Sequence, residues 1–303
     1  MILGRALSDA AVKLAASDVE LPERTAHWLW QHVSGMQTHE ILAGLRQEVD
    51  DEALARFGAL VLRRARREPL QYILGETEFC GLLFHTDARA LIPRPETEIL
   101  VHAAITDISA RLATGVYTET TPLTICDVGT GSGAIAVTVA RKLLDTGVSQ
   151  GWRVIGIDDS ADALSLAEQN AIGCGVQQHV LWQQGDLISP LTDEKIDVLL
   201  ANLPYIPEGD LPDMQPEVSR YEPAMALFAG IDGLDLYRRL IAQMISLPVL
   251  APKAWMIWEI GHDQCAAVLR MIRNAWPTSE TTVIPDQQGI ERFVCTRFTS
   301  LLD

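Results

Sequence analysis

The sequence has few cysteines, and none of them has the paired spacing of a cysteine framework. Its five cysteines are widely separated along 303 residues and include no Cys-x-x-Cys pair. That pattern is typical of reduced thiols, and it argues against both a disulfide framework and a zinc site. The cysteines therefore favour a protein of the cytoplasm.

Positive charge is also scarce. Only 24 basic side chains face 40 acidic ones, which gives a formal net charge of −16. Because Lys and Arg contacts with phosphate supply most non-specific affinity for nucleic acids, this balance argues against a protein that coats RNA or DNA. No apolar run is long enough to span a bilayer, and Arg5 and Asp9 interrupt the apolar stretch that a signal peptide needs. We expect no direct nucleic-acid partner, no membrane partner and a cytoplasmic location.

Hydrophobic residues make up 48% of the chain, enough for a sizeable core. In residues 1–74 they recur at three- and four-residue spacing, which predicts a small all-helical domain. Acids at 50–52 and arginines at 63–67 match the dipole of one of these helices. We interpret the arginine run as a solvated helix end rather than a nucleic-acid patch.

The pattern changes after residue 74. Short β-like runs around Gly81 predict a hairpin linker over residues 75–94. From residue 95 to 303, strands alternate with helices, which predicts an α/β domain with a mainly parallel, doubly wound sheet. We expect helices between the first five strands, and a final hairpin that makes one strand antiparallel. The seven predicted strands cover residues 123–127, 153–158, 180–183, 196–201, 254–259, 282–285 and 292–297.

A glycine-rich turn follows the first of these strands. The run Asp127-Val128-Gly129-Thr130-Gly131-Ser132-Gly133 leads from strand to helix, and its glycines allow backbone N–H groups to approach a bound ligand. The next strand ends at Asp158, where an acid can hold ribose hydroxyls. Because NAD and S-adenosylmethionine both carry a ribose, these residues alone leave the cofactor open.

The fourth strand ends in Asn202-Leu203-Pro204-Tyr205, where ligands of open α/β sheets bind. The Asn202 oxygen can accept one hydrogen of a neutral amide or amino group, and a backbone carbonyl can accept the other. Pro204 stiffens the turn, and Tyr205 offers a flat face. A plain strand-to-loop turn would use the same residues. Since no Ser/His/Asp set, metal cluster or phosphate-clamping lysine stands out, we expect no metal and a reaction that depends on positioning.

The Asp-x-Gly-x-Gly-x-Gly form of residues 127–133 resembles the first motif of class I S-adenosylmethionine methyltransferases. This resemblance implies a Rossmann-like fold with a seven-stranded, mostly parallel sheet. It also implies that Asp186 accepts from the adenine amine and that Leu187 flanks the ring, although Asp186 also suits a helix cap. The implied cofactor-binding residues are Gly129, Thr130, Gly131, Ser132, Gly133, Asp158, Asp186, Leu187 and Asn202.

Asn-x-Pro-Tyr in this place is similar to the motif of amino- and amide-nitrogen methyltransferases. Four further stretches resemble one family among them, the protein-(glutamine-N5) methyltransferases that act on class I peptide chain release factors. The resemblance covers nearly the whole chain in family order. These stretches are REPLQYILG at 67–75, LIPRPETE at 91–98, RYEP at 220–223 and DGLDLYRR at 232–239.

The family resemblance implies the substrate, the glutamine of a Gly-Gly-Gln loop. Asn202 and the Pro204 carbonyl would hold its amide while Tyr205 packs against it, so these three are the implied catalytic residues. Leu203, the fourth residue of the substrate-binding segment, stands where the family has proline, and we expect a less rigid loop. The helical domain and hairpin would recognise the release factor, and we expect a monomer.

Three other functions fit parts of the sequence. Dimethyladenosine transferases of ribosomal RNA share Asn-Leu-Pro-Tyr, but their extra helical domain follows the catalytic one and they are typically basic. A nicotinamide-dependent oxidoreductase would use the same glycine turn but leaves Asn202 to Tyr205 unexplained. A catalytically silent protein could bind the cofactor and merely dock on a release factor. The alternative that we keep is the ribosomal RNA adenine-amino methyltransferase.

Overall fold

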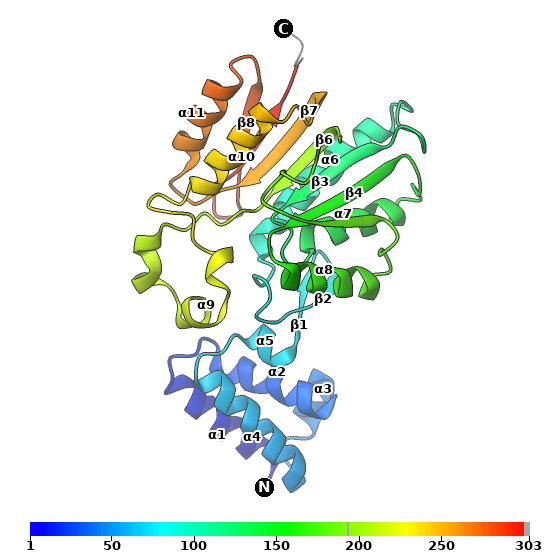
Figure 1. The fold of residues 1–303 in the computed structure, drawn as a ribbon. Helices are drawn as coiled ribbons and strands as arrows, with labels where there is room; N and C mark the ends of the chain where they lie inside the picture. Colours follow the sequence, from blue (N-terminus) through cyan, green and yellow to red (C-terminus); the bar gives the residue numbers. More distant parts are fainter. Residues whose placement is uncertain (193, 300–303) are drawn as a thin grey trace. The chain divides into compact units, whose positions relative to one another are not determined.

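The computed structural model describes residues 1–192 and 194–299, which form two compact units (Figure 1). The first unit comprises Met1–Glu76 together with Met214–Tyr221. The second comprises Thr77–Asp213 and the chain from Glu222 onward. Residues 214–221 lie far from the first helices in sequence, and nothing in the sequence indicated that they belong with them.

The first unit is helical, as predicted. Its helices are amphipathic and bury one face each in a shared apolar cluster that includes Leu14, Leu29 and Phe57. Asp50 caps one helix by accepting a hydrogen bond of 2.8 Å from the Ala53 backbone N–H. The helices are α1 (Leu3–Ala15), α2 (Pro22–Ser34), α3 (Thr38–Ala43), α4 (Asp51–Ala65), α5 (Leu70–Leu74) and α9 (Pro216–Tyr221).

The arginines at the end of α4 are not a solvated helix end, so that interpretation is wrong. Arg64 is only 7% exposed. Its guanidinium lies 2.7 Å from a carboxylate oxygen of Glu217 in α9, and Arg67 lies 2.6 Å from the other oxygen. Arg63 pairs with Glu68 at 2.5 Å. The two ion pairs with Glu217, which sequence patterning does not predict, tie α9 to the helical unit.

The second unit has a seven-stranded sheet in the order β5-β4-β3-β6-β7-β9-β8, which confirms the predicted fold class. All its strands are parallel to their neighbours except β9, which runs antiparallel to β7 and β8. The strands are β3 (Leu123–Val128), β4 (Trp152–Asp158), β5 (Val180–Gln184), β6 (Ile196–Ala201), β7 (Leu250–Glu259), β8 (Glu280–Pro285) and β9 (Glu291–Arg297).

Helices cover both faces of this sheet (Figure 1). Alternate residues of β3 point to opposite faces, so that Ile125 joins the apolar cluster under α6 and α7 while Cys126 joins the one under α10 and α11. The expected helix between β5 and β6 is wrong, since none of the residues described there is helical. The helices and 3₁₀ turns are η1 (Pro95–Thr97), α6 (Glu98–Leu112), α7 (Ala134–Asp145), α8 (Ala161–Gly173), η2 (Glu208–Asp213), η3 (Ala224–Ala226), α10 (Asp235–Ser246) and α11 (Cys265–Ala275).

The predicted hairpin is present as β1 (Glu76–Phe79) and β2 (Leu82–His85). Phe79 and Phe84 are fully buried in the same cluster as α6 and α7, with their rings edge to face at 6.0 Å. The hairpin is therefore anchored in the core of the second unit.

Candidate active site

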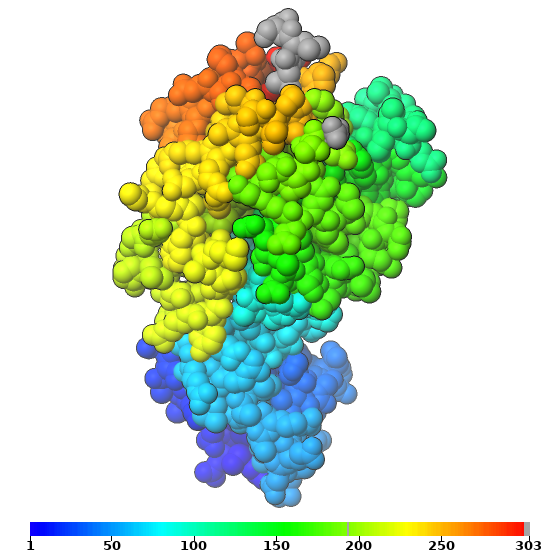
Figure 2. All heavy atoms as spheres, viewed as in Figure 1, coloured from blue at the N-terminus to red at the C-terminus, as the bar shows by residue number. Residues whose placement is uncertain are grey.

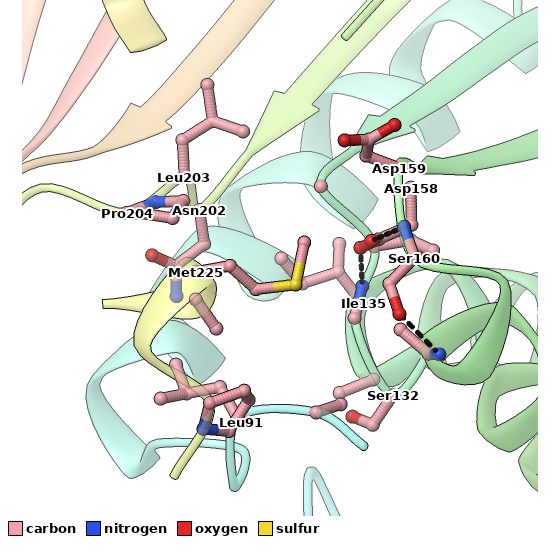
Figure 3. A pocket seen from close by; sticks show the side chains of 18 of the residues that line it. Leu91, Ser132, Ile135, Asp158, Asp159, Ser160, Asn202, Leu203, Pro204 and Met225 are labelled. Atoms are coloured by element: carbon pink, nitrogen blue, oxygen red, sulfur yellow. Dashed lines mark hydrogen bonds between the residues drawn. The ribbon is translucent and has the colours of Figure 1, made fainter. Parts of the chain in front are cut away.

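A cavity of about 380 Å³ opens at the carboxyl ends of β3, β4 and β6 (Figure 3). Its lining comes from segments far apart in the sequence, and all of them belong to the second unit. Of the described residues expected here, Gly133 and Tyr205 do not line it. The expected residues that do are Gly129, Thr130, Gly131, Ser132, Asp158, Asp186, Leu187, Asn202, Leu203 and Pro204.

The glycine turn is fixed by short contacts on both sides. Gly129 has a φ of +71°, and a Cβ on it would come within 2.7 Å of Leu203 Cδ2. The backbone N–H groups of Gly129 and Thr130 both donate to the Ile157 carbonyl of β4, at 2.8 and 2.9 Å. Only glycine therefore fits at position 129 without strain or displacement of Leu203.

Gly133 packs the turn against the helices instead of lining the cavity. It is the N-cap of α7, with a φ of +79°. A Cβ there would lie 2.9 Å from the Ala167 Cβ of α8 and 3.1 Å from the Trp182 ring. Its lack of a side chain thus allows a close contact with α8. Because Gly133 does not line the cavity, this contact does not support the expectation that it binds a cofactor.

Asp127 supports the turn from beneath. Its Oδ2 accepts from the Thr130 hydroxyl at 2.6 Å and from the Ala136 backbone N–H at 3.2 Å, while its buried Oδ1 has no partner among the described residues. Complete burial raises the pKa of Asp127 to about 7, against the opposing effect of the two hydrogen bonds.

Asp158 forms the polar wall of the cavity at the end of β4. Its Oδ2 accepts from the Gly131 backbone N–H at 2.8 Å, and its Oδ1 accepts from the Ser160 backbone N–H at 2.9 Å (Figure 3). Burial raises the pKa of Asp158, and the backbone hydrogen bonds lower it. Since each carboxylate oxygen has two lone pairs, both oxygens can still accept from a ligand hydroxyl.

Asp186 has protein partners at the other end of this wall. Arg239 of α10 lies 2.5 Å from its Oδ1, and Gln243 donates to its Oδ2 at 3.1 Å. In Figure 2 the yellow surface of α10 accordingly borders the light-green surface of the segment after β5. Leu187 is buried with a φ of +53°. A ligand amine bound at this position would share the Asp186 carboxylate oxygens with Arg239.

Asn202 and Leu203 leave the end of β6 in opposite directions (Figure 3). The Asn202 side chain donates from Nδ2 to the Thr97 hydroxyl at 3.0 Å. Leu203 is 2% exposed and belongs to the apolar cluster under α10 and α11. Pro204 lines the cavity beside them.

Leucine in place of proline exchanges the ring for a longer, acyclic side chain and adds an N–H group, and both are used here. The side chain packs beneath Gly129, and the backbone of Leu203 hydrogen-bonds the Tyr237 hydroxyl. Burial raises the pKa of Tyr237 well above its usual value, and the Leu203 bond acts against that rise. These contacts offset the expected loss of rigidity.

Tyr205 turns its polar groups toward the protein. Its hydroxyl donates to Glu259 Oε1 at 3.4 Å, and its backbone carbonyl accepts from Gln264 at 2.8 Å. Burial, and then the charge of Glu259, raises the pKa of the Tyr205 phenol. The structure thus places the ring behind the Asn202 turn rather than in the cavity lining.

Sequence reasoning missed several residues of this site. Met225 extends into the cavity between Asn202 and Ile135 (Figure 3). Arg94 donates to Glu222 at 2.6 Å, and this bond joins two of the stretches on which the family resemblance rests. The acid in one of these stretches and the base in the other could have suggested this pair, whereas Met225 has no distinguishing pattern.

Two other features concern the expectations of no metal ion and no membrane partner. Among the described residues, Cys80, Glu98 and His102 place three possible metal-ligand atoms within 4.8 Å of one another, but Glu98 already accepts from the Cys80 backbone N–H. Burial raises the pKa of the Cys80 thiol to about 12. Over the described part of the chain, no helix combines the length and apolarity needed to cross a membrane.

Known proteins resemble both units. Residues 5–75 match the PrmC N-terminal domain, and residues 120–227 match a methyltransferase domain. The release factor glutamine methyltransferase of Moorella thermoacetica is 38% identical over 96% of this chain and 97% of its own length. The enzyme of the same name from Geobacter sulfurreducens is 36% identical over 93% of this chain and 91% of its own.

Among solved structures, the hMettl16 catalytic domain in complex with MAT2A 3'UTR hairpin 6 superposes with a TM-score of 0.54. It is 16% identical and covers 82% of each chain, so it supports the methyltransferase fold alone. The near full-length similarity to the curated enzymes decides the family, because it includes the helical unit as well as the sheet. The chain belongs to the release factor glutamine methyltransferase family.

Proposed function

We propose that this enzyme transfers a methyl group from S-adenosylmethionine to the side-chain amide nitrogen of the glutamine in the Gly-Gly-Gln loop of class I release factors. The observation that carries the proposal is the common cavity of the glycine turn, Asp158 and Asn202. A cofactor wall and an amide-binding group face one space at the carboxyl ends of parallel strands. Methylation of this loop would support translation termination.

The residues present fit S-adenosylmethionine. The cavity volume of about 380 Å³ lies in the usual range for small-molecule sites. Asp158 keeps lone pairs for the ribose hydroxyls, and the backbone at Gly131 is open, since a Cβ there would meet nothing closer than Ala90 at 3.9 Å. Leu187 and Asp186 would border the adenine. When bound, the cofactor supplies an electrophilic methyl group on a sulfonium.

The protein's part in the reaction is to hold a poor nucleophile. An amide nitrogen is unreactive because its lone pair is delocalised into the carbonyl. With one N–H bound to the Asn202 oxygen and the other to the Pro204 carbonyl, the nitrogen lone pair is directed toward the cofactor side of the cavity. Met225, which extends into the cavity beside Asn202, would lie next to this path. Stacking of Tyr205 on the glutamine stays a prediction.

The helical unit is the proposed recognition element for the release factor. We assign residues 1–74 to recognition, 75–94 to the hairpin linker and 95–303 to catalysis, in an enzyme that acts as a monomer in the cytoplasm. The family's own N-terminal domain matches residues 5–75, which supports a common role for this unit. An acidic chain of net charge −16 also suits a protein substrate better than RNA.

Mass spectrometry of a release factor after incubation with the enzyme and S-adenosylmethionine tests the proposal. We expect one added methyl group on the Gly-Gly-Gln glutamine. Asn202→Ala should lower kcat by about 10²–10³-fold, as removal of a positioned hydrogen-bonding group does elsewhere. The exposed Asn274→Ala in α11 is the matched control.

Three results would contradict the proposal. One is an unmodified release factor after incubation with the wild-type enzyme. Another is methyl transfer to adenine of ribosomal RNA at a higher rate than to the release factor. The third is undiminished methylation by Asn202→Ala, which would remove this residue from the reaction.

A further inference from the structure

The Asn202 side chain can face the cavity with either its oxygen or its NH₂ group, and the two orientations have opposite chemistry. Only the oxygen can accept from a substrate amide, whereas the NH₂ group would repel its hydrogens. The two ends have nearly the same shape, so packing alone does not separate them. The hydrogen bonds on the far side of the amide must therefore decide the orientation.

Those hydrogen bonds run from Asn202 to the end of β7. The Thr97 hydroxyl donates to Glu259 Oε2 at 2.6 Å and accepts from Asn202 Nδ2 at 3.0 Å. Thr97 and Glu259 are 4% and 1% exposed, so no bulk water competes for these groups. The side chains of Thr97, Asn202 and Glu259 thus form one chain of donors and acceptors that runs from the half-buried Asn202 to the buried Glu259.

The direction of this chain follows from its charged end. An ionised carboxylate can only accept, and the Thr97 hydroxyl has a single proton to give. Once that proton is committed to Glu259, the remaining side of the Thr97 oxygen can only accept. It therefore pairs with the NH₂ end of Asn202 and rejects the carbonyl end.

We propose that Thr97 and Glu259 are positioning residues that lock the Asn202 carboxamide with its oxygen toward the substrate. This inference rests on the proposed function, because the locked oxygen matters only if a neutral amide is the acceptor. Thr97 borders the cavity, but its hydroxyl is engaged by Glu259 and Asn202 and is not offered to the substrate. Both positioning residues act through Asn202, and the expected signature is a loss of turnover without a loss of cofactor binding.

The surroundings of Glu259 keep its carboxylate in place. The Tyr205 hydroxyl donates to its other oxygen, Oε1, at 3.4 Å, and the Tyr237 hydroxyl of α10 donates to its backbone carbonyl. Arg292 of β9 favours its negative charge, and Glu96 in η1 opposes it. Burial has the largest effect and raises the pKa of Glu259 to about 7, although the hydrogen bonds from Thr97 and Tyr205 and the charge of Arg292 lower it. The carboxylate is thus ionised above neutral pH.

The test removes the Thr97 hydroxyl while keeping the shape of the side chain. We expect Thr97→Val to lower kcat by about tenfold to hundredfold, the effect of a misaligned reactant. The affinity for S-adenosylhomocysteine, measured by calorimetry, should remain within about twofold of wild type, since a tenfold change in affinity would need about 1.4 kcal/mol. Thr97→Ser, which keeps the hydroxyl, should recover most of the rate.

Thr138 in α7 provides the matched control. It is also fully buried, but its hydroxyl has no hydrogen-bond partner in the described part of the chain. Thr138→Val therefore makes the same replacement in the same unit, and we expect an unchanged rate. A second comparison places Thr97→Val in the Asn202→Ala background. If Thr97 acts through Asn202, the second substitution adds nothing to the first.

A measurement that needs no methyl transfer separates this inference from the proposed function. Hydrogen exchange of the Asn202 side-chain NH₂ group, followed by NMR, should accelerate in Thr97→Val and not in Thr97→Ser. If the wild-type enzyme were inactive but showed this exchange pattern, the proposed methyl transfer would be contradicted, while the positioning of Asn202 by Thr97 would be supported. If Thr97→Val fails to fold, the same measurements of kcat, cofactor affinity and hydrogen exchange are made on Glu259→Gln.

Several outcomes would overturn the inference. Undiminished kcat in Thr97→Val would do so, as would an equal further loss when it is added to Asn202→Ala. Unchanged exchange of the Asn202 NH₂ group in Thr97→Val would show that the hydroxyl does not hold the amide.

Discussion

Each side of the cavity depends on a carboxylate, half-buried Asp158 or fully buried Glu259, and the two carboxylates are held in different ways. On the side proposed for the cofactor, Asp158 accepts from the backbone N–H of Gly131, in the turn after β3, and from that of Ser160, two residues beyond Asp158. Glu259, on the side of Asn202, accepts from the hydroxyls of Thr97 and Tyr205, which come from distant segments. Burial raises the pKa of both carboxyls. The first wall is built by backbone geometry and the second by side chains.

This difference predicts how each side responds to change. Backbone donors stay in place when a side chain is replaced, so the cofactor wall should fail mainly through steric clashes or loss of the acid. The hydroxyl donors disappear with their side chains, so the substrate side should lose alignment while the fold survives.

The largest effect should come from a methyl group added where the two sides meet. Gly129→Ala places a Cβ 2.7 Å from Leu203 Cδ2 and forces alanine to a φ of +71°. We expect the free energy of unfolding to fall by about 2–4 kcal/mol, from the left-handed conformation and the overpacking together. Chemical denaturation measures it. The double variant with Leu203→Ala should lose less than the sum of the two; strict additivity would show that the contact carries no energy.

The next effect should be confined to the cofactor side. Asp158→Ala removes the acceptor of the Gly131 and Ser160 N–H groups and of the proposed ribose bonds. We expect the affinity for S-adenosylhomocysteine to fall by about tenfold to hundredfold, since bonds to a charged group are lost. Calorimetry measures this, and kcat at saturating cofactor should change much less. An unaltered affinity would remove Asp158 from the cofactor site.

The third effect is a pH dependence of kcat that arises from the Asn202 side of the cavity. Because the pKa of Glu259 is about 7, the carboxylate that Thr97 requires is lost as the pH falls through neutrality. We expect kcat of the wild type to fall below about pH 7. Glu259→Gln should remove this limb and lower kcat at pH 8 by about tenfold, which corresponds to about 1.4 kcal/mol. A pH profile of the two enzymes checks it, and an unchanged limb in the variant would assign the titration to another group.

The contribution of Glu259 to stability should change with pH in the direction opposite to its effect on kcat. The pKa of Glu259 is higher in the folded protein than its usual value of 4.5, so ionisation of this group destabilises the fold. Its contribution to the free energy of unfolding should be full below about pH 4.5 and lost as the pH rises through about 7. The difference between wild type and Glu259→Gln isolates this contribution from that of Asp127, whose pKa is also about 7.

The same comparison explains how far the sequence could lead. The cofactor wall is encoded locally: a strand, three glycines and an acid at the next strand end occupy fixed spacings, and all but Gly133 line the cavity. The sheet followed from alternating apolar patterns, although the predicted helix between β5 and β6 was wrong. Asn202 could be placed at the same cavity because it too follows a strand end, and its role there stays a prediction.

The substrate side depends on contacts that have no spacing to recognise. Thr97 and Glu259 are 162 positions apart, and Glu217 joins the arginines of α4 from 150 positions away. A buried threonine and a strand-end glutamate are common in any sheet protein. Their roles appear only when the fold brings them within hydrogen-bond distance, which patterning along the chain does not specify.

The smallest effect should follow a return to the family pattern at the junction of the two sides. Leu203→Pro removes the N–H group that contacts Tyr237 and part of the side chain beneath Gly129, at a cost of about 1–2 kcal/mol. The ring offsets about 0.4–1 kcal/mol of this by restricting the unfolded chain. Asn202 follows directly after β6, so the extended backbone that proline imposes on its predecessor suits it. We therefore expect a loss of about 1 kcal/mol in denaturation and a kcat within about threefold of wild type. A much larger loss of kcat would mean that Leu203 itself shapes the amide site, and that this chain aligns its substrate differently from relatives with proline.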